Sequence, residues 1–310
     1  MVRGDQLWVN RRPAENGVAA PIVPWRVVLH RCGVSELEQD TRLEKVGPGR
    51  FRVRITDRWN IGTAPNGGYL AVITTKSIAA SLPHPHPFSV TTHFLSTARL
   101  GTAEVQVEIV RSGRGHGTAE AKLFQEGKEI VRTLAVFGDL STVVGPTAVT
   151  VTPPDLPPFE QCEHGRAGPT TALSIADRID VGMRPGAVSW VPGPDGAPRA
   201  RSEQAVLEGW VRLRDGAEPD PISLVFFADA FPPPILNLSS VQTPWVPTLE
   251  LTVHVRAVPA PGLLAARFIT RALVSGYLEE DGELWDSQGR LVALSRQLAR
   301  IQRVEQGGKP

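Results

Sequence analysis

The stretch from Asp220 to Pro234 places a carboxylate where a carboxylate is costly. Its apolar residues predict a short helix over 222–231 that ends at three prolines, because proline cannot continue a helix. Asp229 falls on the apolar face of that helix and near its C-terminus, where the helix dipole disfavours negative charge. A buried carboxylate is normally paired, protonated or functional. Asp229 is therefore the first candidate for chemistry, with a hydrogen-bonded structural aspartate as the alternative.

The histidines carry weaker signals than Asp229. His84 and His86 have the spacing of a metal pair, but without further ligands the His-Pro-His-Pro run is typical of a stiff, exposed loop, so no metal site is expected. His93 and His254 fall in predicted strands, where packed or hydrogen-bonded histidines are expected. The chain has no Gly-x-Ser-x-Gly motif, which argues against a serine hydrolase of the α/β class.

A basic, glycine-rich run covers residues 111–117. It lacks the spacing and the final Lys-Ser/Thr of a phosphate-binding loop, so a hairpin or strand junction is expected there. Contact between Arg111 or Arg114 and the phosphates of coenzyme A is the alternative, because guanidinium groups bind phosphate well.

Composition narrows the class of protein. The 310 residues suit two domains or one large one, and a net charge of +1 gives no indication of nucleic-acid binding or of an anionic membrane surface. Cys32 and Cys162 show neither disulfide nor zinc-site spacing. No apolar run approaches the ~20 residues of a membrane span, and the first residues lack a signal-peptide core. A cytoplasmic protein without a membrane partner is expected.

The elements that must position Asp229 occur twice along the chain. A strand, an apolar helix and a four-strand meander are predicted in roughly 50–140 and again in roughly 206–301, with glycine turns at Gly127 and Gly289. In the first copy the helix follows Gly68 and is apolar on nearly every side, so it should be buried. The pattern predicts an α+β architecture. The expected organisation is an N-terminal extension (1–34), a first repeat (35–140), a proline-rich connector (141–182), a second repeat (183–303) and a tail (304–310).

Several short motifs occur in an order that resembles a known family. They are Pro65-Asn-Gly-Gly-Tyr-Leu, Val90-Thr-Thr-His-Phe-Leu, Val110-Arg-Ser-Gly-Arg and Ala135-Val-Phe-Gly-Asp in the first half, then Phe227-Ala-Asp-Ala, Pro247-Thr-Leu-Glu-Leu-Thr and Gly289-Arg-Leu-Val-Ala-Leu-Ser-Arg-Gln in the second. Over roughly 37–301 the chain resembles the double-hotdog acyl-CoA thioesterases of the TesB type and the broader thioesterase-like superfamily. The resemblance implies two repeats, each with a long central helix wrapped by an antiparallel β-sheet.

The resemblance also implies a water-activating trio. The family's aspartate falls on Asp229, its threonine on Thr248 and its glutamine on Gln297, with Thr252 as the substitute if the alignment across the preceding loop shifts. Such a trio would hydrolyse the thioester of acyl-CoA or of an acyl carrier, without a metal or redox cofactor.

Further residues complete the implied site. An oxyanion contact from backbone N–H groups at the start of a helix falls near Gly67 and Gly68 or on the second helix, and we expect Asn66, Gly67, Gly68, Arg111 and Arg114 to bind substrate. Two alternatives are a hotdog hydratase or dehydratase, which would need a histidine beside the aspartate, and a non-catalytic acyl-thioester binding protein. Open sheet edges make a homodimer of double hotdogs the expected assembly.

Overall fold

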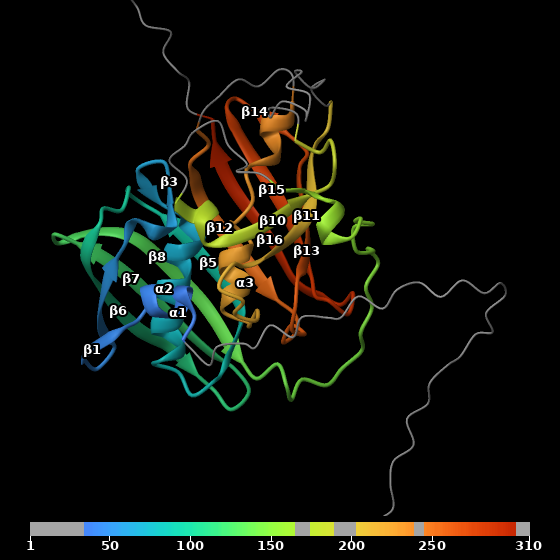
Figure 1. Ribbon diagram of the computed structural model, residues 1–310. Coiled ribbons are helices and arrows are strands. Elements are labelled where there is room, and N and C mark those ends of the chain that lie inside the picture. Colours follow the sequence, from blue (N-terminus) through green and yellow to red (C-terminus); the bar gives the residue numbers. More distant parts are fainter. Residues whose placement is uncertain (1–33, 165–173, 189–202, 239–244, 302–310) are drawn as a thin grey trace, which may run out of the picture. The chain divides into compact units, whose positions relative to one another are not determined.

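The computed structural model describes residues 34–164, 174–188, 203–238 and 245–301. Nearly all of the predicted N-terminal extension and the whole predicted tail lie outside the described residues, as does Cys32. The described chain forms a large antiparallel β-sheet of fourteen strands with few helices (Figure 1). The first half of the chain builds one end of this sheet and the second half builds the other.

The first half contributes strands whose alternating sequences place one face inward. In β2 (Arg50–Ile55), for example, Phe51, Val53 and Ile55 are buried while the intervening arginines are exposed. The sheet order is β1-β2-β6-β7-β8-β5. The other strands are β1 (Glu44–Gly47), β5 (His86–Phe94), β6 (Gly101–Ser112), β7 (Gly117–Gln125) and β8 (Lys128–Gly138).

The second half continues the same sheet from β12 (Thr248–Val255), which pairs with β5. The order from there is β12-β16-β15-β13-β11-β10-β9. These strands are β9 (Glu163–His164), β10 (Ile179–Met183), β11 (Ala205–Leu213), β13 (Leu264–Thr270), β15 (Tyr277–Trp285) and β16 (Leu291–Arg300), while β14 (Leu273–Val274) pairs with β15 alone.

The two halves share one strand order. If the five main strands of each half are numbered along the chain, both halves run 1-3-4-5-2 across the sheet: β2-β6-β7-β8-β5 and β11-β13-β15-β16-β12. The repeated order agrees with the repeated pattern of the sequence. The strands that come second in each half meet at the centre, where the hydroxyls of Thr91 and Thr252 lie 2.9 Å apart.

Helix α2 (Gly67–Ala79) is the long helix predicted in the first half, and it is buried on most sides. It packs against β5, β6, β7 and β8 and against α3. Two of its buried hydroxyls are satisfied within the helix: Thr75 donates to the carbonyl oxygen of Ala71 (2.7 Å) and Ser77 to that of Ile73 (2.9 Å). The helix can therefore be buried without leaving these groups unpaired.

Helix α3 corrects the prediction for the second half. It spans only Ser223–Phe227, so the described part of the second half has no long central helix, and Asp229 lies in the turn after α3 rather than on its face. The prolines from Pro232 onward lack N–H donors, and Phe231, which precedes them, is disfavoured in the helical conformation. Asp220 caps the start of this helix, with Oδ1 accepting from the N–H groups of Ile222 and Ser223 at 2.7 Å.

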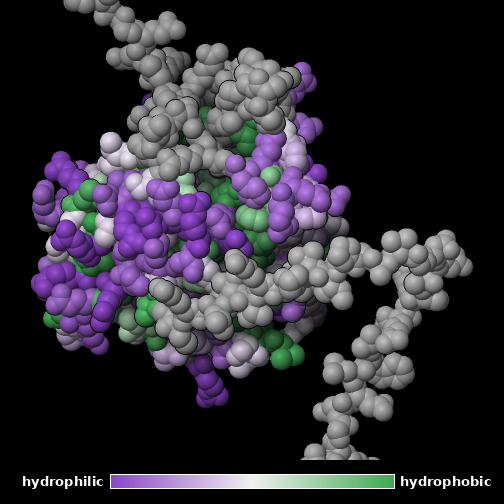
Figure 2. Space-filling model, viewed as in Figure 1, coloured by the Kyte–Doolittle hydropathy of each residue, from purple (hydrophilic) through white to green (hydrophobic). Residues whose placement is uncertain are grey.

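Short elements complete the fold. They are α1 (Glu36–Asp40), the 3₁₀ helices η1 (Asp57–Trp59), η2 (Phe159–Gln161), η3 (Ser174–Asp177) and η4 (Pro234–Asn237), and a separate ribbon of β3 (Asn60–Ile61) and β4 (Ala64–Pro65). Among the described residues, no helix is long and apolar enough to cross a membrane. Hydrophilic side chains predominate over the first half on the face seen in Figure 2, with hydrophobic ones in smaller patches between them.

Candidate active site

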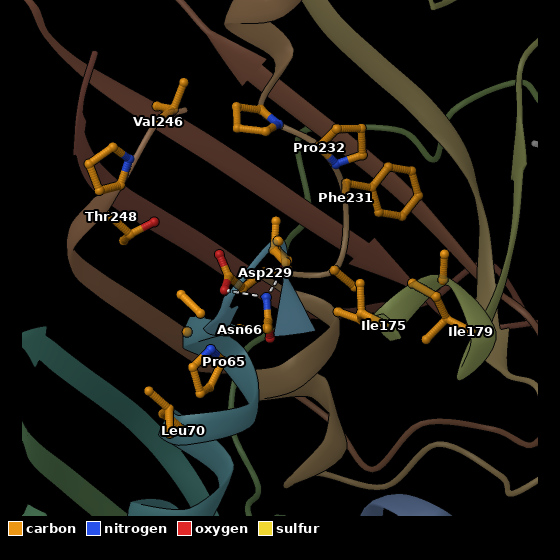
Figure 3. A pocket seen from close by; sticks show the side chains of 18 of the residues that line it. Pro65, Asn66, Leu70, Ile175, Ile179, Asp229, Phe231, Pro232, Val246 and Thr248 are labelled. Carbon is orange, nitrogen blue, oxygen red and sulfur yellow. Dashed lines mark hydrogen bonds between the residues drawn. The ribbon is translucent and has the colours of Figure 1, made fainter. Parts of the chain in front are cut away.

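A pocket of about 1170 Å³ opens where the N-terminus of α2 meets the turn after α3. Three of the predicted site residues from the second half, Asp229, Thr248 and Gln297, line it together with Asn66 and Gly67 from the first half. Figure 3 shows Asp229 between two walls, with Ile175, Ile179 and Phe231 on one side and Val246 and Thr248 on the other. The pocket therefore has polar groups beside an apolar surface.

The carboxylate of Asp229 is held by the start of α2. Its Oδ2 accepts from the backbone N–H of Gly68 at 2.7 Å. The same oxygen accepts from Nδ2 of Asn66 at 2.9 Å (Figure 3). Nδ2 of Asn66 also donates to the carbonyl oxygen of Asp229 (2.9 Å), while its Oδ1 caps α2 by accepting from the N–H of Tyr69 (2.9 Å). The positive end of the α2 dipole thus faces a negative side chain from the other half of the chain.

Burial raises the pKa of Asp229 from its ordinary value to about 6, and the hydrogen bonds from Gly68, Asn66 and Gly67 partly oppose that rise. The carboxyl group is enclosed by protein even though part of the residue faces the pocket. A carboxylate with a pKa near 6 is mostly ionised at neutral pH and is a stronger base than an ordinary aspartate.

The glycine pair at the start of α2 permits this close approach. A Cβ on Gly67 would lie 2.9 Å from Oδ2 of Asp229, and a Cβ on Gly68 would lie 2.8 Å from the carbonyl oxygen of Phe226. Any side chain at Gly68 would press against backbone, which cannot move as a rotamer can. The two glycines therefore let the helix N-terminus reach the acid.

Thr248 and Gln297 meet on neighbouring strands. The hydroxyl of Thr248, at the start of β12, donates to Oε1 of Gln297 in β16 at 3.0 Å. Thr252, the alternative from the sequence, bonds instead to Glu250 and to Thr91 and does not line the pocket. The structure thus brings Thr248, and not Thr252, to the site.

The arginines predicted to bind substrate are not brought to this pocket. Arg111 and Arg114 are exposed where β6 turns into β7, and neither lines the pocket. The adjacent Gly117 packs on Leu82, which follows the C-terminus of α2, whereas Asp229 lies at its N-terminus. A 13-residue helix is roughly 20 Å long, so these arginines lie far from the acid.

The predictions for the histidines also need correction. His84 is buried and its Nδ1 has no hydrogen-bond partner among the described residues, while His86 is the first residue of β5 rather than part of an exposed loop. His93 and His254 do lie in strands, but both are exposed because their positions fall on the outer face of the sheet.

Comparison with protein families agrees with this geometry. Residues 55–138 match the family model of the acyl-CoA thioesterase N-terminal domain, and residues 153–301 match that of the acyl-CoA thioesterase C-terminal domain. The chain belongs to the acyl-CoA thioesterase family. The protein is thus a thioester hydrolase.

Solved structures similar to this thioesterase cover most of it. A candidate thioesterase II from Thermobifida fusca YX is 34% identical, with a TM-score of 0.77 over 87% of this chain and 98% of its own. A hot-dog-fold protein of unknown function from Alicyclobacillus acidocaldarius is 22% identical, with a TM-score of 0.74 over 86% and 98%. The acyl-CoA thioesterase II TesB2 of Mycobacterium marinum is 19% identical, with a TM-score of 0.65 over 87% and 99%. The last two show the shared fold.

One acidic residue near the site of the thioesterase escaped the sequence analysis. Glu280 is 4% exposed in β15, where it faces inward between Leu278 and Gly282. Burial, and then the negative charge of Asp229, raise the pKa of Glu280 well above its usual range. The signal that could have found it is the one that found Asp229: a carboxylate at an inward position of an alternating strand.

Proposed function

We propose that this thioesterase hydrolyses acyl-CoA, or the acyl thioester of a carrier protein, to a free acid and a thiol. Asp229, Thr248 and Gln297 activate the attacking water. The observation that carries the proposal is Asp229, with its pKa raised to about 6, lining a pocket in which polar groups lie beside an apolar surface.

The reaction follows from the groups that line the pocket. Asp229 takes a proton from a water molecule, whose oxygen attacks the thioester carbonyl. Gln297 and Thr248 orient that water, since amide and hydroxyl groups offer both donors and acceptors. The tetrahedral intermediate then expels the thiolate, which recovers the proton from Asp229. The acyl chain lies against the apolar wall formed by Ile175, Ile179 and Phe231.

The start of α2 has two roles in this mechanism. Before attack it stabilises the Asp229 carboxylate, and after attack the negative charge has moved to the substrate oxygen while Asp229 is neutral. We assign the oxyanion contact to Gly67, because Gly67 lines the pocket and Gly68 does not. The same helix dipole then acts on both charges.

The proposal includes a double-hotdog architecture, with repeats at 35–140 and 183–303 joined by the connector 141–182. The common strand order of the two halves supports it, with the second helix shortened to α3. We also propose that the protein works in the cytoplasm. A free thiol at Cys162 is compatible with that reducing compartment.

The test is Asp229→Asn, which keeps the shape of the side chain and removes the base. We expect kcat to fall by roughly 10² to 10⁴, the usual contribution of a general base, while the protein stays folded and still binds acyl-CoA. Thiol release from a chain-length panel of acyl-CoAs, followed with a thiol reagent, measures it.

The matched control is Asp155→Asn, at an exposed aspartate that does not line the pocket. It should keep wild-type activity. Full activity of the Asp229→Asn variant would exclude Asp229 as the base. No turnover of any chain length by the wild type would favour a hydratase, a dehydratase or a binding protein.

A further inference from the structure

Glu280 is a buried carboxyl group whose burial the fold alone does not explain. It lies in the middle of β15 on the face that also buries Leu278 and Leu284. Its Oε2 has no hydrogen-bond partner, and no lysine, arginine or histidine pairs with it in the part of the chain that the structure describes. A carboxyl group in such a place costs stability, and an apolar residue of similar size would fit the register better.

The position of Glu280 relative to Gln297 suggests why the carboxyl group is there. The two residues face each other directly across β15 and β16, and Gln297 is only 5% exposed. A glutamine amide has an acceptor end and a donor end, and its neighbours decide which way it points. Oε1 of Gln297 accepts from the hydroxyl of Thr248 at 3.0 Å, which leaves Nε2 as the donor end of the amide opposite Glu280. The Gln297 side chain partly opposes the rise in the pKa of Glu280.

We propose that Glu280 is a positioning residue of the water-activating site: it accepts a hydrogen bond from Nε2 of Gln297 and so fixes the amide with Oε1 towards Thr248. The second N–H of Nε2 is then held in place for the water or the substrate oxygen. This inference rests on the proposed function, because the water-orienting role of Gln297 is part of it.

The charges of the two acids fit this division of roles. Asp229 receives N–H donors from the start of α2, while Glu280 has only the Gln297 amide and lies close enough to Asp229 for their charges to repel. Two neighbouring carboxyl groups in unequal environments ionise in sequence. Asp229 ionises first and is the base, whereas Glu280 keeps its proton to higher pH than Asp229 and accepts through its carbonyl oxygen.

Two substitutions at Glu280 separate positioning from folding. Glu280→Gln keeps a carbonyl oxygen that can accept from Gln297, so kcat should stay within about threefold of wild type. Glu280→Leu removes the acceptor, so kcat should fall about 10- to 100-fold, the usual effect of a lost orienting contact, with KM little changed. The leucine variant should melt no lower than wild type, because it removes a carboxyl group with an unpaired oxygen.

The matched control is Glu279→Leu, which alters the adjacent carboxylate on the opposite face of β15 and should leave kcat unchanged. A second readout is the side-chain amide NMR signal of Gln297, which should shift and exchange faster in Glu280→Leu but not in Glu280→Gln. Wild-type kcat in Glu280→Leu, or equal losses of kcat and melting temperature in both variants, would overturn the positioning role. If the wild type turns over no thioester, the proposed function fails, and the amide signal still decides the positioning.

Discussion

Each half of the thioesterase buries a cluster of polar side chains, and the two clusters differ in how completely they are satisfied. In the first half the hydroxyl of Thr133 lies 2.7 Å from that of Thr74 and 3.0 Å from that of Thr92, and all three residues are fully buried. This cluster is neutral and closed on itself. In the second half Thr248, Gln297 and Glu280 form a chain beside Asp229 that leaves one oxygen without a partner.

This difference distinguishes a cluster that stabilises the fold from a cluster that we propose takes part in the reaction. Hydroxyls that satisfy each other stabilise the packing of α2 on β5 and β8 and have nothing left to offer a substrate. The acids beside the pocket have pKa values raised by burial, so their ionised forms are less stable than those of exposed carboxylates. Such groups take up a proton more readily. The same strand order therefore accommodates a closed polar cluster in one half and, in the other half, the acids that we propose for the reaction.

The two helices also differ in the residue that is bound at their N-termini. The N-terminus of α3 is capped by its own Asp220, whereas the N-terminus of α2 binds Asp229 from the other half. In the second half the helix has only 5 residues, and Asp229 lies in the turn that follows it. The aspartate of the candidate site is thus held by the N-terminus of α2, while α3 is capped by an aspartate of its own half.

Among the tests that compare the two clusters, Gln297→Leu should have the largest effect on kcat. Loss of the amide leaves the attacking water without an orienting group, so kcat should fall by about 10² to 10³. The melting temperature should fall only modestly, because the leucine fills the same buried site while Thr248 and Glu280 lose the amide beside them. Steady-state thiol release and a melting curve measure both quantities. A kcat within threefold of wild type would remove Gln297 from the mechanism.

Lowering the pH should have a smaller and graded effect on kcat. Asp229 acts as a base only when ionised, so protonation below its pKa of about 6 should lower kcat about tenfold per pH unit. Above that pH the group is a carboxylate and the dependence should level off. A kcat profile from pH 4.5 to 8, with stability checked at each pH, tests the assignment. A profile that stays flat down to pH 5 would contradict it.

The smallest effect on activity should come from the closed cluster. Thr133→Val removes the hydroxyl shared by Thr74 and Thr92 and should cost about 1–2 kcal/mol of unfolding free energy. It should leave kcat unchanged, which is the opposite outcome to that of Gln297→Leu. Urea unfolding measures the cost, with the exposed Thr102→Val as the control. A large loss of kcat without loss of stability would show that the first-half cluster also takes part in the reaction.

The sequence by itself determined the elements with strong local periodicity. The alternation of residues such as Phe51, Val53 and Ile55 set the strands, and the apolar run after Gly68 set the buried helix, because these patterns depend on neighbours a few residues apart. Asp229 also stood out from its local setting. The resemblance of the short motifs to a known family then identified Thr248 and Gln297 as candidate site residues.

Tertiary structure decided which groups meet. The donor that holds Asp229 comes from Gly68, 161 residues away, and Glu280 faces Gln297 only through the β15–β16 register. The distance of Arg111 from the pocket was likewise set by how segments remote in sequence pack together. Local periodicity tells a residue's face but not its partner, because partners are fixed by long-range strand pairing and by the approach of α2 to the turn at Asp229.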